Sequence, residues 1–178
     1  MSKGVKLKAN FSAKELAKKL DKLVADGLNV MGRNINLEIQ NNIDKGVDVD
    51  GNKFEPLKQS TKDERARLGF STNKPLERTG KMRGTKFTTA KAANPVFTIQ
   101  MTGKSQRTGE HYGAFHNQGY TNSAKSMYPG AKVPQRKWFG IPENMQPGKP
   151  GYERAMKEVT KRIGEAFKTN FKVVGKYM

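Results

Sequence analysis

The sequence predicts an α+β protein in which a long N-terminal helix and a C-terminal helix pack on a small antiparallel sheet, with long loops. Two observations lead to this class. Apolar residues recur at helical spacing near both ends of the chain, and two short segments in the middle alternate apolar and polar residues. At 178 residues the chain has the length of one domain. We expect residues 1–178 to form it, with 1–11 as an N-terminal arm and 169–178 as either a last short strand or a flexible tail.

The N-terminal helix has both a start signal and a long apolar stripe. Ser12 and Glu15 have the spacing of a capping box, which satisfies two backbone amides at a helix start. Apolar residues then follow at steps of three and four: Leu16, Leu20, Leu23, Val24, Leu28, Met31, Ile35, Ile39 and Ile43. We expect a helix to about Asn42. Gly27 and Gly32 indicate a bend or a close helix contact. We interpret this helix as a packing and assembly element.

The middle of the chain predicts a turn, a short helix and two strands. The run from Asp48 to Gly51 is a strong turn signal, and residues 60–69 are typical of a short helix with a hydroxyl cap and a glycine stop. Strands are expected at about 85–90 and 96–102, with Phe97, Ile99 and Met101 on the inward face. A second helical stripe, from Tyr152 to Phe167, follows a linker at 144–151.

The segment from Tyr112 to Asn144 predicts a binding architecture. Tyr112–Gln118 is a short amphipathic helix stopped by a glycine, and 133–142 is an aromatic strand confined by prolines to a sheet edge. About a dozen mostly polar and glycine residues between them form a long loop of the kind that is usually functional. If the strand alternates, Trp138 and Phe139 face opposite sides, whereas a bulge near Gly140 would place both in the core.

Composition limits the class of partner. The hydrophobic fraction of 34% predicts a thin core and an extended or oligomeric molecule. The net charge of +18 favours nucleic acid, anionic lipid or an acidic protein surface, although a well-solvated basic surface is the alternative. The absence of cysteine excludes disulfides and thiolate sites. No apolar run reaches the ~20 residues that span a bilayer, and the N-terminus lacks the apolar core of a signal peptide.

One segment concentrates the positive charge. Between residues 76 and 109 the only acid is Glu77, and the basic residues are Arg78, Lys81, Arg83, Lys86, Lys91, Lys104 and Arg107. Such a hairpin can face DNA or another acidic partner, or it can be a solvated surface. The sequence does not decide between these interpretations.

Catalytic and metal-binding patterns fail when tested. His111 and His116 are five residues apart, whereas helical metal ligands stand four apart, and no further histidine or cysteine completes a site. In a calcium loop starting at Gly46 that first position is not an acid, and Leu57 stands in place of the bidentate glutamate. No serine lies in a nucleophile elbow. We therefore expect neither an enzyme nor a cofactor.

Four short motifs, in order, resemble a known family. The first is Asp50-Gly51-x-x-Phe54-x-Pro56-Leu57-Lys58, the second Pro75-Leu76-x-x-Thr79-Gly80, the third His116-Asn117-x-Gly119, and the fourth Val133-Pro134-x-Arg136-x-Trp138-Phe139-Gly140. Together they resemble the phage virion morphogenesis family, the tail-completion proteins of Mu-like and related contractile-tailed phages. The resemblance spans about residues 30 to 167. Lys137 stands where such proteins commonly have a second proline.

The resemblance implies a structural protein of the virion neck, assembled in the host cytoplasm. It implies a tail terminator that caps the tail tube and joins tail to head as a ring, expected to be hexameric. The implied partners are other copies of the chain, tail tube and sheath proteins, head–tail connector proteins, and packaged DNA held without sequence specificity; no membrane is implied. The expected interface residues are His116, Gly119, Val133, Pro134, Arg136, Trp138 and Phe139. The alternatives are a head-side connector or stopper, or a stand-alone nonspecific DNA-binding protein.

Overall fold

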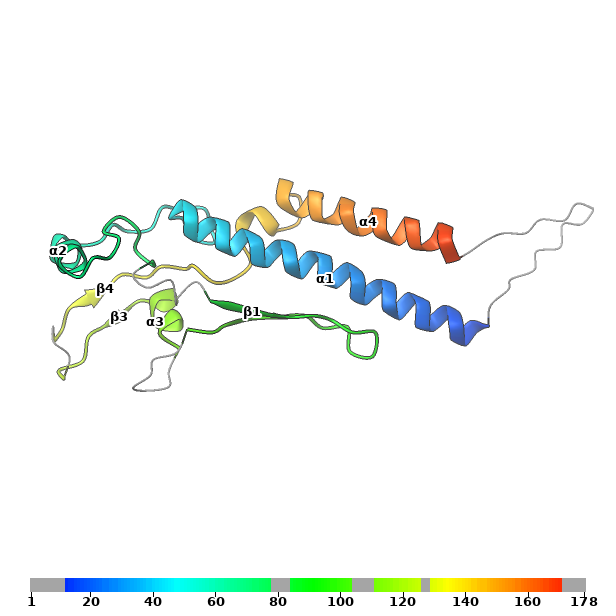
Figure 1. Ribbon diagram of the computed structural model, residues 1–178, viewed down its shortest axis with the longest axis horizontal. Helices are drawn as coiled ribbons and strands as arrows, with labels where there is room; N and C mark the ends of the chain where they lie inside the picture. The colour runs from blue at the N-terminus through cyan, green and yellow to red at the C-terminus, as the bar shows by residue number, and fades with distance from the viewer. Residues whose placement is uncertain (1–11, 78–83, 104–110, 126–128, 171–178) are drawn as a thin grey trace, which may run out of the picture.

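The computed structural model describes residues 12–77, 84–103, 111–125 and 129–170, and shows an elongated molecule (Figure 1). In chain order its elements are α1 (Ala13–Lys45), α2 (Gln59–Arg67), β1 (Thr85–Thr88), β2 (Thr98–Met101), α3 (Tyr112–Gln118), β3 (Tyr120–Thr121), β4 (Lys132–Val133), the 3-10 helix η2 (Glu143–Met145) and α4 (Pro150–Asn170). The predicted α+β class, with long helices at both ends of the chain and antiparallel strands between them, is confirmed.

Helix α1 starts where the capping signal predicts. The Glu15 amide donates to the Ser12 hydroxyl oxygen at 3.2 Å, and the Ser12 amide donates to the Glu15 carboxylate at 2.8 Å. The helix continues three residues past the predicted end, to Lys45, and stops at Gly46, whose φ of 70° is a left-handed conformation that favours glycine. At 33 residues, α1 is about 50 Å long, which makes it the axis of the molecule.

Helix α1 is the middle of three layers, with α4 on one side and the β1–β2 hairpin on the other (Figure 1). Both of its interior glycines lie at close contacts. A Cβ on Gly27 would stand 3.1 Å from Val159 of α4, and a Cβ on Gly32 would stand 2.5 Å from Phe87 and 2.8 Å from Phe97. The two glycines therefore let α4 and the hairpin approach the helix backbone. The predicted close helix contact is found at Gly27, whereas the contact at Gly32 is with the hairpin.

The strands form two separate antiparallel pairs. β1 pairs with β2 in the register Thr85 to Met101 and Thr88 to Thr98, and β3 pairs with β4. Both strands of the first pair are shorter than predicted. The expected inward face is confirmed, because Ile99 and Met101 pack against the core and Phe97 lies against α1.

The predicted strand at 133–142 is wrong for most of its length. Only Lys132–Val133 pairs, with Tyr120–Thr121. Pro134 has no amide to continue the ladder, and the next backbone groups bond to other elements. The Lys137 carbonyl accepts from the Val49 amide at 2.8 Å, and the Phe139 amide donates to the Asn117 side chain at 3.0 Å. The segment is held by tertiary contacts and not by a sheet.

The predicted helix at 60–69 exists as α2, but its cap differs. The residue before its first turn is Lys58, which makes no side-chain capping bond, so the predicted hydroxyl cap is wrong. The glycine stop is confirmed by Gly69, which has a φ of 72°. None of the helices in the described ranges is long and apolar enough to cross a membrane.

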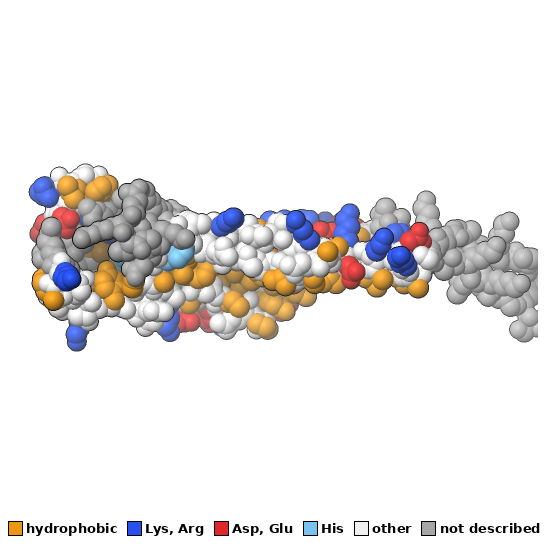
Figure 2. Space-filling model, turned by 90° about the horizontal axis from the view of Figure 1, so that it is seen from below, with side chains coloured by type: hydrophobic (Ala, Val, Ile, Leu, Met, Phe, Trp, Pro, Cys, Tyr) orange, Lys and Arg blue, Asp and Glu red, His pale blue; other side chains and the backbone are white. Residues whose placement is uncertain are grey.

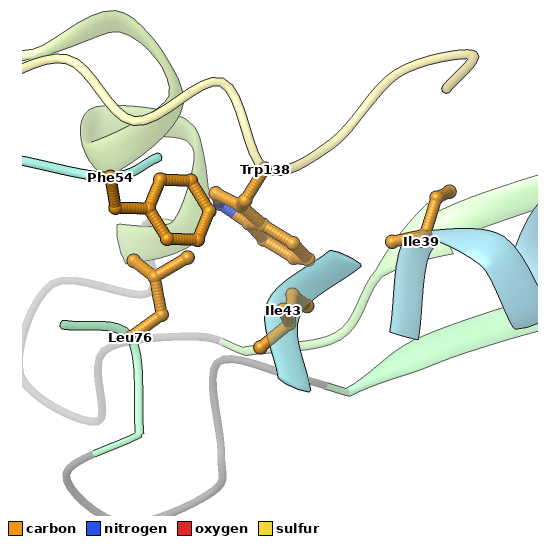
Figure 3. Packing of buried hydrophobic residues seen from close by; sticks show 5 residues of the cluster. All are labelled: Ile39, Ile43, Phe54, Leu76 and Trp138. Atoms are coloured by element: carbon orange, nitrogen blue, oxygen red, sulfur yellow. The ribbon is translucent and has the colours of Figure 1, made fainter. Parts of the chain in front are cut away.

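The main described cluster of the hydrophobic core lies at the C-terminal end of α1. Ile39 and Ile43 from the last turns of α1 meet Phe54, Leu76 and Trp138, which come from three loops (Figure 3). Trp138 is 1% exposed and is among the largest fully buried side chains. Smaller buried side chains continue the core along the α1–α4 pair, among them Ala25, Val30, Ala155 and Val159.

Candidate functional site

The four sequence motifs meet at the C-terminal end of α1, although 74 residues lie between the end of the first at Lys58 and the start of the last at Val133. Phe54 of the first motif, Leu76 of the second and Trp138 of the fourth are all buried in the same cluster (Figure 3). The third motif lies on α3, which packs directly against the fourth. What the motifs share is therefore a position in the fold, and the surface that they form is the candidate functional site.

Hydrogen bonds join α3 to the fourth motif along its length. The Trp138 indole donates to the Gly113 carbonyl at 2.9 Å, and the Arg136 amide donates to the His116 carbonyl at 2.7 Å. The Asn117 side-chain oxygen accepts from the Phe139 amide. Because each bond uses a backbone group or a buried side chain, the pairing fixes the position of the fourth motif even though that segment is not a strand.

Two glycines make this close approach possible. A Cβ on Gly113 would stand 2.7 Å from the Trp138 ring, and a Cβ on Gly119 would stand 2.9 Å from the Gln135 amide nitrogen. Gly119 also has a φ of 74°, which side-chain-bearing residues rarely adopt. The glycine of the third motif is therefore required by both conformation and space.

A small cleft opens between the first, third and fourth motifs and α2. Its volume is about 180 Å³. Two buried arginines line it, Arg65 at 7% and Arg136 at 5% exposure, together with His116. The exposed Lys58 and Lys132 also line it, and Glu55 is the only acid among the lining residues that the structure describes. The cleft is therefore electropositive.

The two buried arginines are held differently. The Arg65 guanidinium donates to three backbone carbonyls, those of Ser71, Lys74 and Pro75, at 2.8 to 3.2 Å. It thereby closes the loop between α2 and the second motif. Arg136 donates from Nη2 to the Glu55 carbonyl at 3.1 Å, while its Nε has no hydrogen-bond partner among the described residues.

Electrostatics in the cleft disfavour further positive charge. Burial, together with the smaller effects of the neighbouring Arg136 and Arg65, lowers the pKa of His116 to about 4. Burial also lowers the pKa of Arg136, against the opposing effect of the Glu55 carboxylate. His116 is therefore neutral near pH 7, and its ring meets that of Tyr120 edge to face, with centroids 5.8 Å apart.

The structure brings together all seven predicted interface residues, but it places them differently with respect to solvent. His116, Gly119, Val133 and Pro134 are half-buried, whereas Arg136 and Trp138 are buried. Phe139 is half-buried and packs on Trp138 at a ring distance of 5.5 Å. The two aromatic rings do not face opposite sides, because the backbone here is not an alternating strand. Whether these residues contact another chain stays a prediction.

Most of the predicted basic hairpin lies outside the described residues. This applies to Arg78, Lys81, Arg83, Lys104 and Arg107. Lys86 on β1 and Lys91 after it are both exposed, at the hairpin and away from the cleft. Their role toward DNA stays a prediction.

Sequence reasoning missed Arg65 and the cleft. Arg65 looked like one charged residue among five in a polar helix, and nothing in its spacing marked it as buried. Glu55 lies inside the first motif but contributes its backbone carbonyl, which no residue pattern reports. Within the described ranges no group of three His, Cys, Asp or Glu side chains could hold a metal ion.

Comparison with known proteins supports the resemblance carried by the motifs. No curated protein and no solved structure is significantly similar to the chain. The sequence pattern of the phage virion morphogenesis family, in contrast, matches residues 10–147, which include α1, all four motifs and the cleft. This match covers most of the chain, and the chain therefore belongs to the phage virion morphogenesis family.

Proposed function

We propose that this phage assembly protein is a tail-completion protein of the virion neck. In this proposal copies of the chain close into a ring, expected to be hexameric, which caps the tail tube and joins the tail to the head. The protein acts structurally and needs no enzyme activity or cofactor. Family membership is the observation that carries the proposal, because it sets the context as virion assembly.

The shape and surface of the subunit support self-assembly. The body is long and narrow, and apolar side chains follow much of its length on the face seen in Figure 2. The exposed large hydrophobic residues include Leu20, Val24 and Leu37 of α1, of which Val24 and Leu37 are more than half exposed. Contiguous apolar surface on a soluble protein usually marks an interaction site. A ring needs such lateral surfaces, and closed head-to-tail contacts generate one.

The charge of the molecule supports a position beside DNA. Lys86 and Lys91 are exposed on the hairpin, and α4 adds the exposed Arg154, Lys157 and Lys161. A basic surface around a lumen would meet phosphate without reading sequence. The same charge would also suit an acidic protein ring on the tube or connector, and replacing the hairpin charges as a group distinguishes these partners.

The proposal predicts that self-association depends on the exposed apolar side chains in the first half of α1, Leu20 and Val24. Replacing Leu20 and Val24 together with glutamine should leave the fold intact, because both side chains are exposed. It should reduce the fraction of ring particles in mass photometry and in negative-stain images of purified tail tubes with the protein added. A matched control is Leu68→Gln with Ile141→Gln, which removes two exposed apolar side chains away from α1.

Three outcomes would contradict the proposal, two of them for a protein that stays monomeric. One is a protein that stays monomeric at high concentration and also beside tail tubes. The other is a monomer that binds duplex DNA tightly and does not associate with tubes, which would favour the stand-alone DNA-binding alternative. Rings that bind head connectors and leave tubes uncapped would favour the head-side alternative.

A further inference from the structure

The cleft beside Arg136 is lined by more positive than negative side chains, since Arg65, Lys58 and Lys132 line it with Arg136 and Glu55 is the one acid among its described lining residues. Arg136 is 5% exposed, and no described carboxylate forms an ion pair with it. A second buried arginine, Arg65, lines the same cleft. Burying a charge costs several kcal/mol unless it is paired, and the carboxylate that acts on Arg136 is that of the exposed Glu55, so a ligand carboxylate in the cleft would add the missing close partner.

The hydrogen bonds in the cleft identify the ligand's chemistry. The Nε atom of Arg136 is a buried donor with no partner among the described residues, on a side chain that lines the cavity. A guanidinium donates in a planar fork that matches the two oxygens of a carboxylate. The exposed Lys58 and Lys132 extend the positive field outside the two arginines. The cleft therefore selects an anionic oxygen acceptor.

We propose that this cleft binds one carboxylate side chain, glutamate or aspartate, presented by an acidic segment of a different protein chain. Its volume of about 180 Å³ is smaller than the 300–1,000 Å³ of ordinary small-molecule pockets, which suits one side chain. Pro56, Leu57, Val133 and Pro134 line the same cleft and offer apolar contacts to the methylene groups of such a side chain.

The burial of the arginines and the acidic residues available favour a carboxylate from a different protein over a DNA phosphate and over a second copy of this chain. The phosphates of a DNA duplex lie on a broad surface, whereas Arg136 and Arg65 are almost fully buried and are reached only by a group that projects into the cleft. A second copy of this chain has no run of more than two acidic residues, so it does not carry the acidic segment that this occupant requires. The site belongs to the isolated chain and does not depend on ring formation.

Histidine signals in the wild-type protein provide the primary test. The chain has only two histidines, so its imidazole proton resonances in solution NMR belong to His116 in the cleft and His111 outside it. An acetylated hexaglutamate peptide, added near pH 7 at about 0.15 M salt, should shift the His116 resonances saturably and leave those of His111 unchanged. Hexaglutamine should shift neither. Inorganic phosphate or a short DNA duplex should not displace the hexaglutamate.

Charge variants provide the second test. The Arg136→Gln variant should bind hexaglutamate at least about tenfold more weakly. The double variant Lys58→Gln, Lys132→Gln changes only exposed side chains and should lose about three- to tenfold. The matched control is Lys137→Gln, one residue beyond Arg136, where the exposed amine pairs with Asp50 outside the cleft. It should bind within about twofold of wild type.

Several results would overturn the proposal. Hexaglutamate binding that leaves His116 unmoved, or that falls as much in Lys137→Gln as in the cleft variants, would mean a diffuse charge effect. Displacement by phosphate or DNA would mean a phosphate site. Self-association that requires Lys58 and Lys132 would mean that a second copy fills the cleft. Because every arm uses the isolated protein, these results do not depend on whether rings cap tail tubes.

Discussion

His116 is a residue whose protonation should lower the free energy of unfolding. Its folded pKa of about 4 lies below its ordinary value of 6.5, so the unfolded chain takes up the proton more readily than the folded one. The neutral imidazole therefore contributes stability that is fully present above about pH 6.5 and is lost as the pH falls toward 4. At about 1.4 kcal/mol per pKa unit, reduced for partial exposure, we expect a loss of roughly 1–3 kcal/mol.

Urea unfolding at about pH 7 and about pH 4.5 measures this loss. The wild type and His111→Gln, which keeps His116, should lose this much more stability on acidification than His116→Gln. Carboxylates titrate in all three proteins, so only the difference between variants reports the histidine. An equal loss in all three proteins would show that protonation of His116 does not lower the free energy of unfolding.

Gly113 allows α3 to approach the fourth motif closely, because it has no side chain. In Gly113→Ala the new Cβ would stand 2.7 Å from the buried Trp138 ring, which cannot move without disturbing the core. We expect a loss of about 1–3 kcal/mol in the free energy of unfolding, measured in urea. Gly164→Ala on α4 is the control, because nothing lies within 4 Å of its Cβ. It should be neutral or stabilising by up to about 1 kcal/mol.

Between elements, one buried side chain fixes the hairpin to α1. Asn29 donates to the Ala90 carbonyl at 3.0 Å and accepts from the Ala90 amide at 2.7 Å, so it replaces a strand neighbour for that residue. Both residues are buried. Removing the amide leaves two buried backbone groups unsatisfied, and each costs about 1–3 kcal/mol.

Asn29→Ala should therefore destabilise the protein by roughly 2–4 kcal/mol, measured by chemical unfolding. Asn41→Ala on the same helix should cost less than about 0.5 kcal/mol, because that side chain is exposed. If the two variants were equally stable, the hairpin would not depend on this contact.

Sequence patterns predicted elements best where local chemistry decides them. The capping box and apolar period fixed the start of α1, and alternation gave the inward face of β2. Sequence patterns failed for residues 133–142. Pro134 ends the β-ladder, and the residues after it are held by hydrogen bonds to the Val49 amide and the Asn117 side chain, which are distant in sequence. Arg65 was missed for the same reason, because its partners are carbonyls that carry no residue signature. The four motifs were recognised without any indication that three of them share one core.

At the scale of the whole molecule, replacing charges on the basic hairpin tests whether it faces DNA in a lumen or docks on another protein. If it faces DNA, single replacements should change little, because the residues act together as a screened field. Replacing Arg78, Lys81, Lys86 and Lys91 together with glutamine should then leave folding and ring formation intact and reduce DNA retention in assembled virions. If the hairpin docks on an acidic protein ring, the same change should abolish head–tail joining.

Electron microscopy of lysates counts joined particles directly. The control is a quadruple change on the outer part of α4, at Arg154, Lys157, Lys161 and Arg162, which removes the same charge elsewhere. Normal joining and normal infectivity in the hairpin variant would identify its charge as a solvated surface.

The two halves of helix α1 lie in different environments, and we expect their local stability against unfolding to differ. Its first buried residue is Ala25, so the preceding three turns have little tertiary support, whereas Ile39 and Ile43 lie in the core. Isolated helical turns are marginal in water. Amide hydrogens near Lys18 should therefore exchange with solvent by local fraying, and those near Ile43 only when the whole domain opens. In a monomer the first half of the helix is thus the segment with the most protection to gain from a neighbouring subunit.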